Sequence, residues 1–351
     1  MPPETVIGWD LGGAHLKAAR LASTGRVERV IQLACPLWRG LTELERALDL
    51  ATAALGPAAA HAVTMTGEMA DCFATREEGV TSLVAAMQAR YPGLRIYAGE
   101  LGFVSQDQAA GVALQVASAN WMASAALVAA RMPAALLIDI GSTTTDLVPV
   151  MDGRVWARAR DDAGRMEARE LVYTGVARTP VMAFAAEVPF QGRSVPLVPE
   201  LFATAADVHR LSGRLPPDAD RHPSADGGEK TEAGSARRLA RMIGRDLDTA
   251  SLDDWRQLAH WLAATQVRRI EDACNILLAR NPLPTDAPVV AAGVGRFLAA
   301  DLAARLKRPC LEFARLVPDS AADANSVSDC APAVAVAWLS QGRGGGGPQQ
   351  D

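Results

Sequence analysis

The chain contains the stretch Val-Ile-Gly-Trp-Asp-Leu-Gly-Gly-Ala-His-Leu-Lys at residues 6–17, in which an apolar run ends in aspartate and turns through glycines into a second run. Residues 136–146, Leu-Leu-Ile-Asp-Ile-Gly-Ser-Thr-Thr-Thr-Asp, repeat this order. An apolar run before and after a glycine turn is typical of a β-hairpin. The two stretches align so that Asp10 matches Asp139, and each aspartate is placed at the mouth of its turn.

The likeness continues beyond the turns. Gly12 matches Gly141, and Gly-Arg-Val follows at 25–27 and again at 153–155 after a one-residue gap. Two unrelated hairpins would share apolar runs but not these paired elements at matching offsets. The repeat therefore predicts a duplicated α/β protein, built from two lobes with mixed sheets flanked by helices.

Apolar spacing predicts the remaining elements. Helices are expected over 41–55, 80–90, 113–131, 255–280 and 297–306, and strands over 62–65, 94–97 and 289–292. We expect a first lobe over 1–133 and a second over 134–340, with a mobile loop at 213–236. The glycine-rich residues 341–351 are expected to form a disordered tail.

Composition excludes several classes of protein. With 351 residues, 49% of them hydrophobic and 21% charged, the chain can bury sizeable cores and is not a disordered protein. A net charge of −5 gives no general attraction to nucleic acid or anionic membranes. Charged residues interrupt the most apolar stretch, 116–140, and no signal-peptide pattern is apparent, so a cytoplasmic protein is expected.

The cysteines and most histidines give no metal or disulfide pattern. The five cysteines are odd in number and form no C-x-x-C pair, which favours reduced thiols. The following histidines have no partners at metal-ligand spacing: His61, His209, His222 and His260. Only three of the 35 basic residues are lysines, and of these Lys17 alone falls in one of the repeated motifs.

The two Asp-x-Gly turns are candidate phosphate loops. Glycine lets a phosphate approach the backbone N–H groups, and hydroxyls donate further hydrogen bonds. The candidate phosphate-binding residues are Gly12, Gly13, His15, Gly141, Ser142, Thr143, Thr144 and Thr145. Asp10 and Asp139 would hold Mg²⁺, and Lys17 would supply a point cation. Each loop taken alone is also explained as an ordinary Ser/Thr/Gly turn, and His15 as a residue that only shapes its loop.

These motifs resemble known ones. Residues 10–17 and 139–146 look like the two phosphate motifs of the actin-like ATPase and sugar-kinase superfold, and 291–295 resembles its nucleotide-proximal glycine motif. Within that superfold, the second motif is most similar to the hydantoinase A/oxoprolinase family. A narrower resemblance is to the tetrahydromethanopterin-linked C1-transfer pathway proteins, whose archaeal members are methanofuran-biosynthesis condensing enzymes. It is carried in addition by 66–73, 173–180, 201–208 and 235–242.

The narrower resemblance implies a transferase. It would join an aminomethyl-furanmethyl diphosphate to the phenol of a tyramine or tyrosine unit and release diphosphate, with Mg²⁺ and Lys17 neutralising the leaving group. Asp146, Glu68 and Asp71 are candidate bases for the phenolic proton, and Arg178 would pair with a substrate carboxylate or phosphate. The partners implied are these two small molecules, with neither nucleic acid nor membrane. The sequence leaves open whether the chain is a monomer or a homodimer.

Other interpretations remain open at this point. An ATP-dependent small-molecule kinase or a hydantoinase/oxoprolinase-like hydrolase would bind ATP near Gly293 and Gly295, and a non-catalytic actin-like module would only sense a phosphorylated ligand. Glu68 and Asp71 are equally explained as helix caps, and Asp146 and Arg178 as structural charges. Without a nucleotide, the two glycines would only permit close packing.

Overall fold

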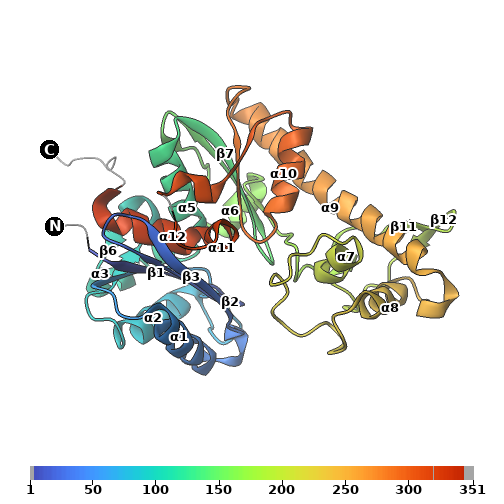
Figure 1. Cartoon of the computed structure of the whole chain (residues 1–351), viewed down its shortest axis with the longest axis horizontal. Coiled ribbons are helices and arrows are strands. Elements are labelled where there is room, and N and C mark those ends of the chain that lie inside the picture. Colours follow the sequence, from blue (N-terminus) through green and yellow to red (C-terminus); the bar gives the residue numbers. More distant parts are fainter. Residues whose placement is uncertain (1–3, 319, 344–351) are drawn as a thin grey trace.

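The computed structural model describes residues 4–318 and 320–343 and contains two mixed β-sheets, each flanked by helices (Figure 1). The first sheet has the order β3-β2-β1-β4-β5-β6. Its strands are β1 (Val6–Leu11), β2 (His15–Leu21), β3 (Val27–Ala34), β4 (Ala60–Met65), β5 (Arg95–Tyr97) and β6 (Phe103–Val104).

The second sheet has the order β10-β8-β7-β13-β14, with β9 paired to β8. Its strands are β7 (Ala134–Ile140), β8 (Thr145–Met151), β9 (Arg154–Val155), β10 (Leu171–Val172), β13 (Val289–Ala292) and β14 (Cys310–Glu312). In each sheet an antiparallel hairpin, β1–β2 or β7–β8, is followed by two parallel pairings, β1–β4–β5 or β7–β13–β14. This shared order confirms the predicted duplication and the mixed sheets.

The one-residue gap between the repeats is a difference in turn length. In the first hairpin, Ala22 N–H donates to Arg26 O at 2.9 Å across a three-residue turn. In the second, Met151 pairs with Arg154 across the two residues Asp152 and Gly153, whose φ angles are +53° and +67°. Positive φ at both central residues is what a two-residue hairpin requires.

The helices of the two lobes cover both faces of the sheets. They are α1 (Leu41–Leu55), α2 (Arg76–Gln88), α3 (Gln106–Ala109), α4 (Ala113–Val116), α5 (Asn120–Arg131), α6 (Asp162–Glu167), α9 (Leu252–Arg280), α10 (Arg296–Arg305), α11 (Ala324–Asp329) and α12 (Ala331–Trp338). The lobes share one core cluster, in which buried residues of β1 and α12 pack with those of α5, β7 and β8. Helix α12 therefore returns to the first sheet, although it lies in the range expected for the second lobe.

A third packed unit lies in the second half of the chain. It contains β11 (Glu187–Phe190), β12 (Arg193–Pro196), α7 (Ala205–Leu211), α8 (Glu232–Met242) and the first half of α9. Its residues form a core cluster of their own around Trp255 and Phe190. Figure 1 shows this unit at the far end of α9, away from the two sheets.

Three expected segments differ in the structure. Residues 113–131 are not one helix: the chain bends by 90° between α4 and α5, where Ser118 has φ +52°. The loop expected over 213–236 ends at Thr231, because α8 begins at Glu232 and buries its small residues. Residues 344–351 of the expected tail lie outside the described residues, but the Gln341 side chain donates to Glu4 O and Ala22 O at 2.8 Å.

Candidate functional site

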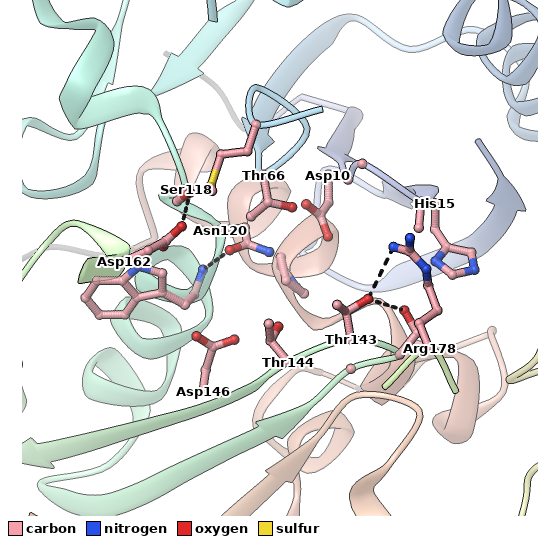
Figure 2. Close-up of a pocket in the computed structure, with 18 of the residues that line it drawn as sticks. Asp10, His15, Thr66, Ser118, Asn120, Thr143, Thr144, Asp146, Asp162 and Arg178 are labelled. Atoms are coloured by element: carbon pink, nitrogen blue, oxygen red, sulfur yellow. Dashed lines mark hydrogen bonds between the residues drawn. The ribbon is translucent and has the colours of Figure 1, made fainter. Parts of the chain in front are cut away.

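The two hairpins face a common cavity of about 330 Å³ between the lobes (Figure 2). Asp10 lies directly opposite Lys17 in the first hairpin, and Asp139 lies directly opposite Asp146 in the second. Directly opposed residues of antiparallel strands point to the same face. All four side chains line the cavity, so the two hairpins place three aspartates and one lysine around one space.

Each turn is closed by the same backbone hydrogen bond. Gly12 N–H donates to His15 O at 2.9 Å, and Gly141 N–H donates to Thr144 O at 2.8 Å. The predicted loop residues Gly12, Gly13, His15, Gly141, Ser142, Thr143 and Thr144 all line the cavity. Thr145 does not, because its hydroxyl donates to Thr174 O at 2.7 Å on the buried side of β8.

The second loop is supported by residues 175–178. Val176 N–H donates to Gly141 O at 3.1 Å, and Arg178 N–H donates to Ser142 O at 2.8 Å. A Cβ on Gly175 would lie 2.4 Å from Thr143 N, so only glycine permits this approach. The conformation of the second loop therefore depends on a segment about 30 residues downstream in the chain.

A buried polar chain continues behind this segment. Gln266 of α9 donates to Gly175 O at 2.9 Å and accepts from His209 Nε2 of α7 at 2.8 Å. Burial lowers the pKa of His209 to about 4, so this histidine is neutral at physiological pH. Two buried side chains, His209 and Gln266, thus connect α7 to the segment that supports the second loop.

The first loop is supported by the segment between α7 and α8. His222 Nε2 donates to Ala14 O at 2.9 Å, and the His222 ring contacts the His15 ring at 4.8 Å. Burial holds the pKa of His15 well below its usual value, and its Nε2 has no hydrogen-bond partner among the described residues. His15 therefore lies neutral at the cavity wall.

Burial dominates the electrostatics of the cavity, and the charge of Lys17 opposes its effect on the two aspartates. Burial raises the pKa of Asp10 to about 6 and that of Asp139 to about 7. Burial alone would lower the pKa of Lys17, but the neighbouring acidic groups, Asp10 foremost, raise it above its usual value. In the part of the chain that the structure describes, Lys17 makes no hydrogen bond or ion pair. Its ammonium is therefore available to an anion in the cavity.

Asp146 is held by an arginine that the sequence did not single out. Arg165 of α6 is 1% exposed, donates to Asp146 Oδ1 at 2.8 Å and stacks on the Trp121 ring at 3.8 Å. Burial raises the pKa of Asp146, and the Arg165 charge offsets this only in part. Asp146 is thus a fixed carboxylate at the cavity wall.

Glu68 lies behind the cavity wall instead of lining it. Its carboxylate accepts from Ser118 Oγ at 2.7 Å, and Ser118 lines the cavity at the break between α4 and α5. Burial raises the pKa of Glu68, and one of its oxygens has no hydrogen-bond partner among the described residues. Its contact with the cavity is therefore through Ser118, whereas Asp71 lines the cavity directly.

Gly293 and Gly295 do not line the cavity either. A Cβ on Gly293 would lie 2.3 Å from Ile140 O, and one on Gly295 would lie 2.5 Å from the Ile140 side chain. These glycines let the turn after β13 pack against β7. Of the two roles expected for them, contact with a nucleotide or close packing, the structure shows close packing.

The mouth of the cavity combines aromatic and cationic side chains. Arg178 lies over the Trp38 ring at 5.0 Å and is 3.5 Å from Thr143 Oγ1. The sequence motifs indicate Arg178 but not the following residues, which also line the cavity: Trp38, Asn120, Trp121, Asp162, Arg165 and Tyr173. The only local signal for them is the 173–180 stretch, which includes Tyr173.

The fold is that of the actin-like ATPases and sugar kinases. Acetone carboxylase aligns over 85% of this chain and 66% of its own, with a TM-score of 0.50 and 10% identity, a likeness of fold alone. A ROK-family glucokinase from Streptomyces griseus aligns over 95% of this chain and 98% of its own, with a TM-score of 0.43 and 15% identity.

Residues 59–339 match the family model described as hydantoinase/oxoprolinase, and the chain belongs to this family. A curated relative from Methanocaldococcus jannaschii is 28% identical over 299 residues, which cover 84% of this chain and 88% of that protein. It is named (4-{4-[2-(gamma-L-glutamylamino)ethyl]phenoxymethyl}furan-2-yl)methanamine synthase.

Two further expectations concern membranes and thiols. Within residues 4–318 and 320–343, no single helix is long and apolar enough to span a membrane. The two segments Gln106–Val116 and Asn120–Arg131 reach the length and composition of a membrane span only when they are taken together, and the chain bends by 90° between them. All five cysteines are free thiols, as expected.

Proposed function

We propose that this chain is a transferase of methanofuran-type cofactor biosynthesis, which condenses an aminomethyl-furanmethyl diphosphate with a phenolic amine and releases diphosphate. The observation that carries the proposal is the cavity shared by Asp10, Asp139 and Lys17 between two phosphate-type loops, in which Lys17 has no bonded partner among the described residues. The similarity to a synthase whose name describes a phenoxymethyl-furan supports an enzyme of this kind.

The proposed reaction balances without a further reactant. The bond between the furan CH₂ and the diphosphate oxygen breaks, and the diphosphate leaves with the electron pair. The phenol oxygen forms the new ether bond to the CH₂ and gives up its proton. An electron-rich furan stabilises positive charge on the CH₂, so the main task of the protein is to stabilise the leaving group and accept one proton.

The leaving diphosphate would lie between the two loops. Backbone N–H groups and the hydroxyls of Ser142, Thr143 and Thr144 are available there as donors, and Lys17 adds a positive charge. The Lys17 ammonium needs no rearrangement to bind an anion, because no protein carboxylate is bonded to it among the described residues. A preorganised charge of this kind is the usual source of a large rate effect.

The donor set also fits magnesium. Asp10 Oδ1 is buried without a hydrogen-bond partner among the described residues, and Asp139 lies across the same cavity. Mg²⁺ is commonly held by one or two carboxylates together with water and phosphate oxygens, which is the donor set that Asp10, Asp139 and a bound diphosphate would provide. When bound at Asp10 and Asp139, Mg²⁺ would neutralise charge on the diphosphate.

Asp146 is the best placed group to accept the phenolic proton. It lines the cavity opposite Asp139 in the hairpin, and Arg165 fixes its orientation. Burial raises its pKa, which makes it a stronger base than an exposed aspartate. Arg178 and Trp38 would contact the aromatic substrates at the cavity mouth.

The test is a reconstitution with defined substrates. Purified protein is incubated with the furan diphosphate and either tyramine or γ-glutamyltyramine, with Mg²⁺ or with EDTA, while released diphosphate and the aryl ether are measured. We expect equimolar diphosphate and ether, and much less of both with EDTA. Absence of ether with every phenol, or ATP consumption with a cyclic amide or sugar, would overturn the proposal in favour of a hydrolase or kinase.

A further inference from the structure

The segment between α7 and α8, residues 212–231, connects the third packed unit to the first lobe. We call it the strap. Near its middle, His222 Nε2 donates to Ala14 O at 2.9 Å, although the two residues are 208 positions apart in the chain. Two residues earlier, Asp220 pairs with Arg210 of α7 at 2.6 Å. The strap is thus anchored to the third packed unit at one point and bonded to the first loop at another.

The carbonyl groups of Gly13 and Ala14 in the first loop are held from outside the cavity. Leu37 N–H donates to Gly13 O at 3.1 Å, and both Cys35 N–H and His222 Nε2 donate to Ala14 O at 2.9 Å. None of these three donor residues lines the cavity. The N–H groups of Gly13 and Ala14, by contrast, make no hydrogen bond within the described residues. A loop with bonded carbonyls and unpaired N–H groups is suited to bind an anion.

The second loop has the same arrangement with a different support. Val176 N–H donates to Gly141 O, and Arg178 N–H donates to Ser142 O. The N–H groups of Ser142 and Thr143 make no hydrogen bond within the described residues. In this part of the chain, the second loop receives all its carbonyl bonds from backbone N–H groups, whereas the first loop receives one from a side chain. The first loop can therefore be altered by a single substitution.

The supports of the two loops meet at α7. At the start of this helix, Ala205 N–H donates to Thr179 O at 2.8 Å and Ala206 N–H donates to Ala177 O at 3.1 Å. Thr179 and Ala177 belong to the stretch of chain that holds the second loop. The strap leaves the other end of α7 and contacts the first loop through His222. One helix and the strap that follows it thus connect the supports of both loops.

We propose that His222 is a positioning residue for diphosphate binding. Its N–H keeps the Ala14 carbonyl turned away from the cavity, so that the first loop presents N–H groups, and no carbonyl oxygen, to the bound anion. This role rests on the proposed function, because diphosphate is the anion that the two loops would hold. His222 does not line the cavity, so it acts only through the loop that it bonds.

The ring and the N–H of His222 make separate contacts, which allows them to be tested separately. The ring centroid lies 4.8 Å from that of His15 and 5.4 Å from that of Trp38. Loss of the N–H leaves Ala14 O bonded to Cys35 N–H, so no buried carbonyl becomes unpaired and stability should change little. What is lost is one of the two bonds that keep this carbonyl turned outward, and a carbonyl oxygen that turns toward the cavity repels an anion.

The experiment measures the affinity for Mg-diphosphate by calorimetry and does not require turnover. His222→Phe keeps the ring and removes the donor, whereas His222→Gln keeps an N–H donor and removes the ring. We expect His222→Phe to bind about three- to tenfold more weakly than the wild type, and His222→Gln to bind within about twofold of it. His260→Phe makes the same change at an exposed histidine of α9 and should bind as the wild type does. Denaturant unfolding checks that every variant is folded.

A measurement on the wild type alone keeps the proposal testable if a variant does not fold. Nitrogen-15 NMR of labelled histidine at pH 8 should show that the neutral His222 ring carries its proton on Nε2, the nitrogen that bonds Ala14 O. A proton on Nδ1 would overturn the proposal. Unchanged diphosphate affinity in His222→Phe, or an equal loss of affinity in His222→Phe and His222→Gln, would also overturn it.

The same measurements separate the role of His222 from the proposed function. Weaker diphosphate binding in His222→Phe together with no ether formation by the wild type would support the positioning role and contradict the transferase. If the wild type bound Mg-ATP but not Mg-diphosphate, the transferase would fail, and the comparison of the same variants with Mg-ATP would decide the role of His222. Binding of neither anion would overturn both.

Discussion

The two hairpins of the cavity share a backbone and differ in charge. Both place an aspartate, Asp10 or Asp139, at the end of the first strand, and both close the turn with the same hydrogen bond. Opposite these aspartates the first hairpin has Lys17 and the second has Asp146. Lys17 has no bonded partner among the described residues, whereas Asp146 is paired with Arg165. Duplication thus supplies the same backbone twice, and the residues at one pair of matching positions, Lys17 and Asp146, give the two hairpins different charges.

The largest effect is expected from breaking the ion pair between Arg165 and Asp146 in the second hairpin. Arg165→Ala removes a buried guanidinium, leaves Asp146 without its partner and opens a space under Trp121. Removing one member of a buried ion pair costs about 3–5 kcal/mol of unfolding free energy. The measurement is denaturant unfolding. Arg160→Ala, which breaks the exposed pair with Glu100, is the control and should cost less than about 1 kcal/mol. Equal losses of unfolding free energy in the two variants would show that the buried pair contributes no more to stability than the exposed pair.

A second test asks whether the support of the second loop depends on pH. The neutral His209 bonds Gln266, and protonation would place an N–H on its Nδ1, which has no partner among the described residues. Because burial lowers its pKa to about 4 from an unfolded value near 6.5, the unfolded chain binds more protons between these values. The stability that His209 contributes is present above pH 6.5 and is lost as the pH falls toward 4, by about 3 kcal/mol.

The measurement for His209 is the unfolding free energy between pH 8 and pH 4.5. His209→Gln should lose less stability than the wild type over this range, whereas the control His260→Gln, exposed on the same α9 helix that holds Gln266, should follow the wild type. Parallel curves for His209→Gln and the wild type would contradict the assignment of a neutral buried histidine.

The third test removes the positive charge of Lys17 in the first hairpin. Lys17→Ala should lower kcat/KM for the furan diphosphate by about 100-fold, since loss of one preorganised group facing a developing negative charge typically has this effect. Lys17→Arg should also impair the enzyme although it keeps the charge, because a planar guanidinium does not replace a compact ammonium beside Asp10. Steady-state kinetics with Lys307→Ala as control checks both. If Lys17→Arg had wild-type activity, the ammonium at position 17 would have no special role. The presence of a lysine there, in a chain with few lysines, would then carry no functional meaning.

The sequence was sufficient for the repeated hairpins because their signals are local. The apolar runs, the Asp-x-Gly turns and the Gly-Arg-Val turns all lie within about 20 residues, and together they predicted the duplicated fold and which loops meet. The break at Ser118 was not predictable, because 113–131 is rich in alanine and has no proline or glycine near the bend. Arg165 was missed since its partners Asp146 and Trp121 are brought to it by tertiary packing.

The glycine motif shows a different limit. Gly293 and Gly295 were ambiguous because a close ligand and a close backbone both require a missing Cβ, and in the structure the neighbour is Ile140 of β7. The same holds for the third packed unit, whose core cluster joins segments between residues 181 and 263 that have no common sequence pattern. Local patterns identified the loops; their supports are long-range contacts.

The smallest expected effects come from two adjacent threonines of the second hairpin, and they separate binding from stability. Thr144 lines the cavity, whereas Thr145 donates to Thr174 O and occupies the position of the buried Leu16 in the first hairpin. Thr144→Val should weaken diphosphate binding several-fold with unchanged unfolding, because only a ligand loses a hydrogen bond. Thr145→Val should cost about 1 kcal/mol of unfolding free energy with unchanged diphosphate binding. Diphosphate binding is measured by calorimetry and stability by denaturant unfolding, on both variants. If Thr145→Val weakened diphosphate binding as much as Thr144→Val does, Thr144 and Thr145 would not differ as cavity and core residues.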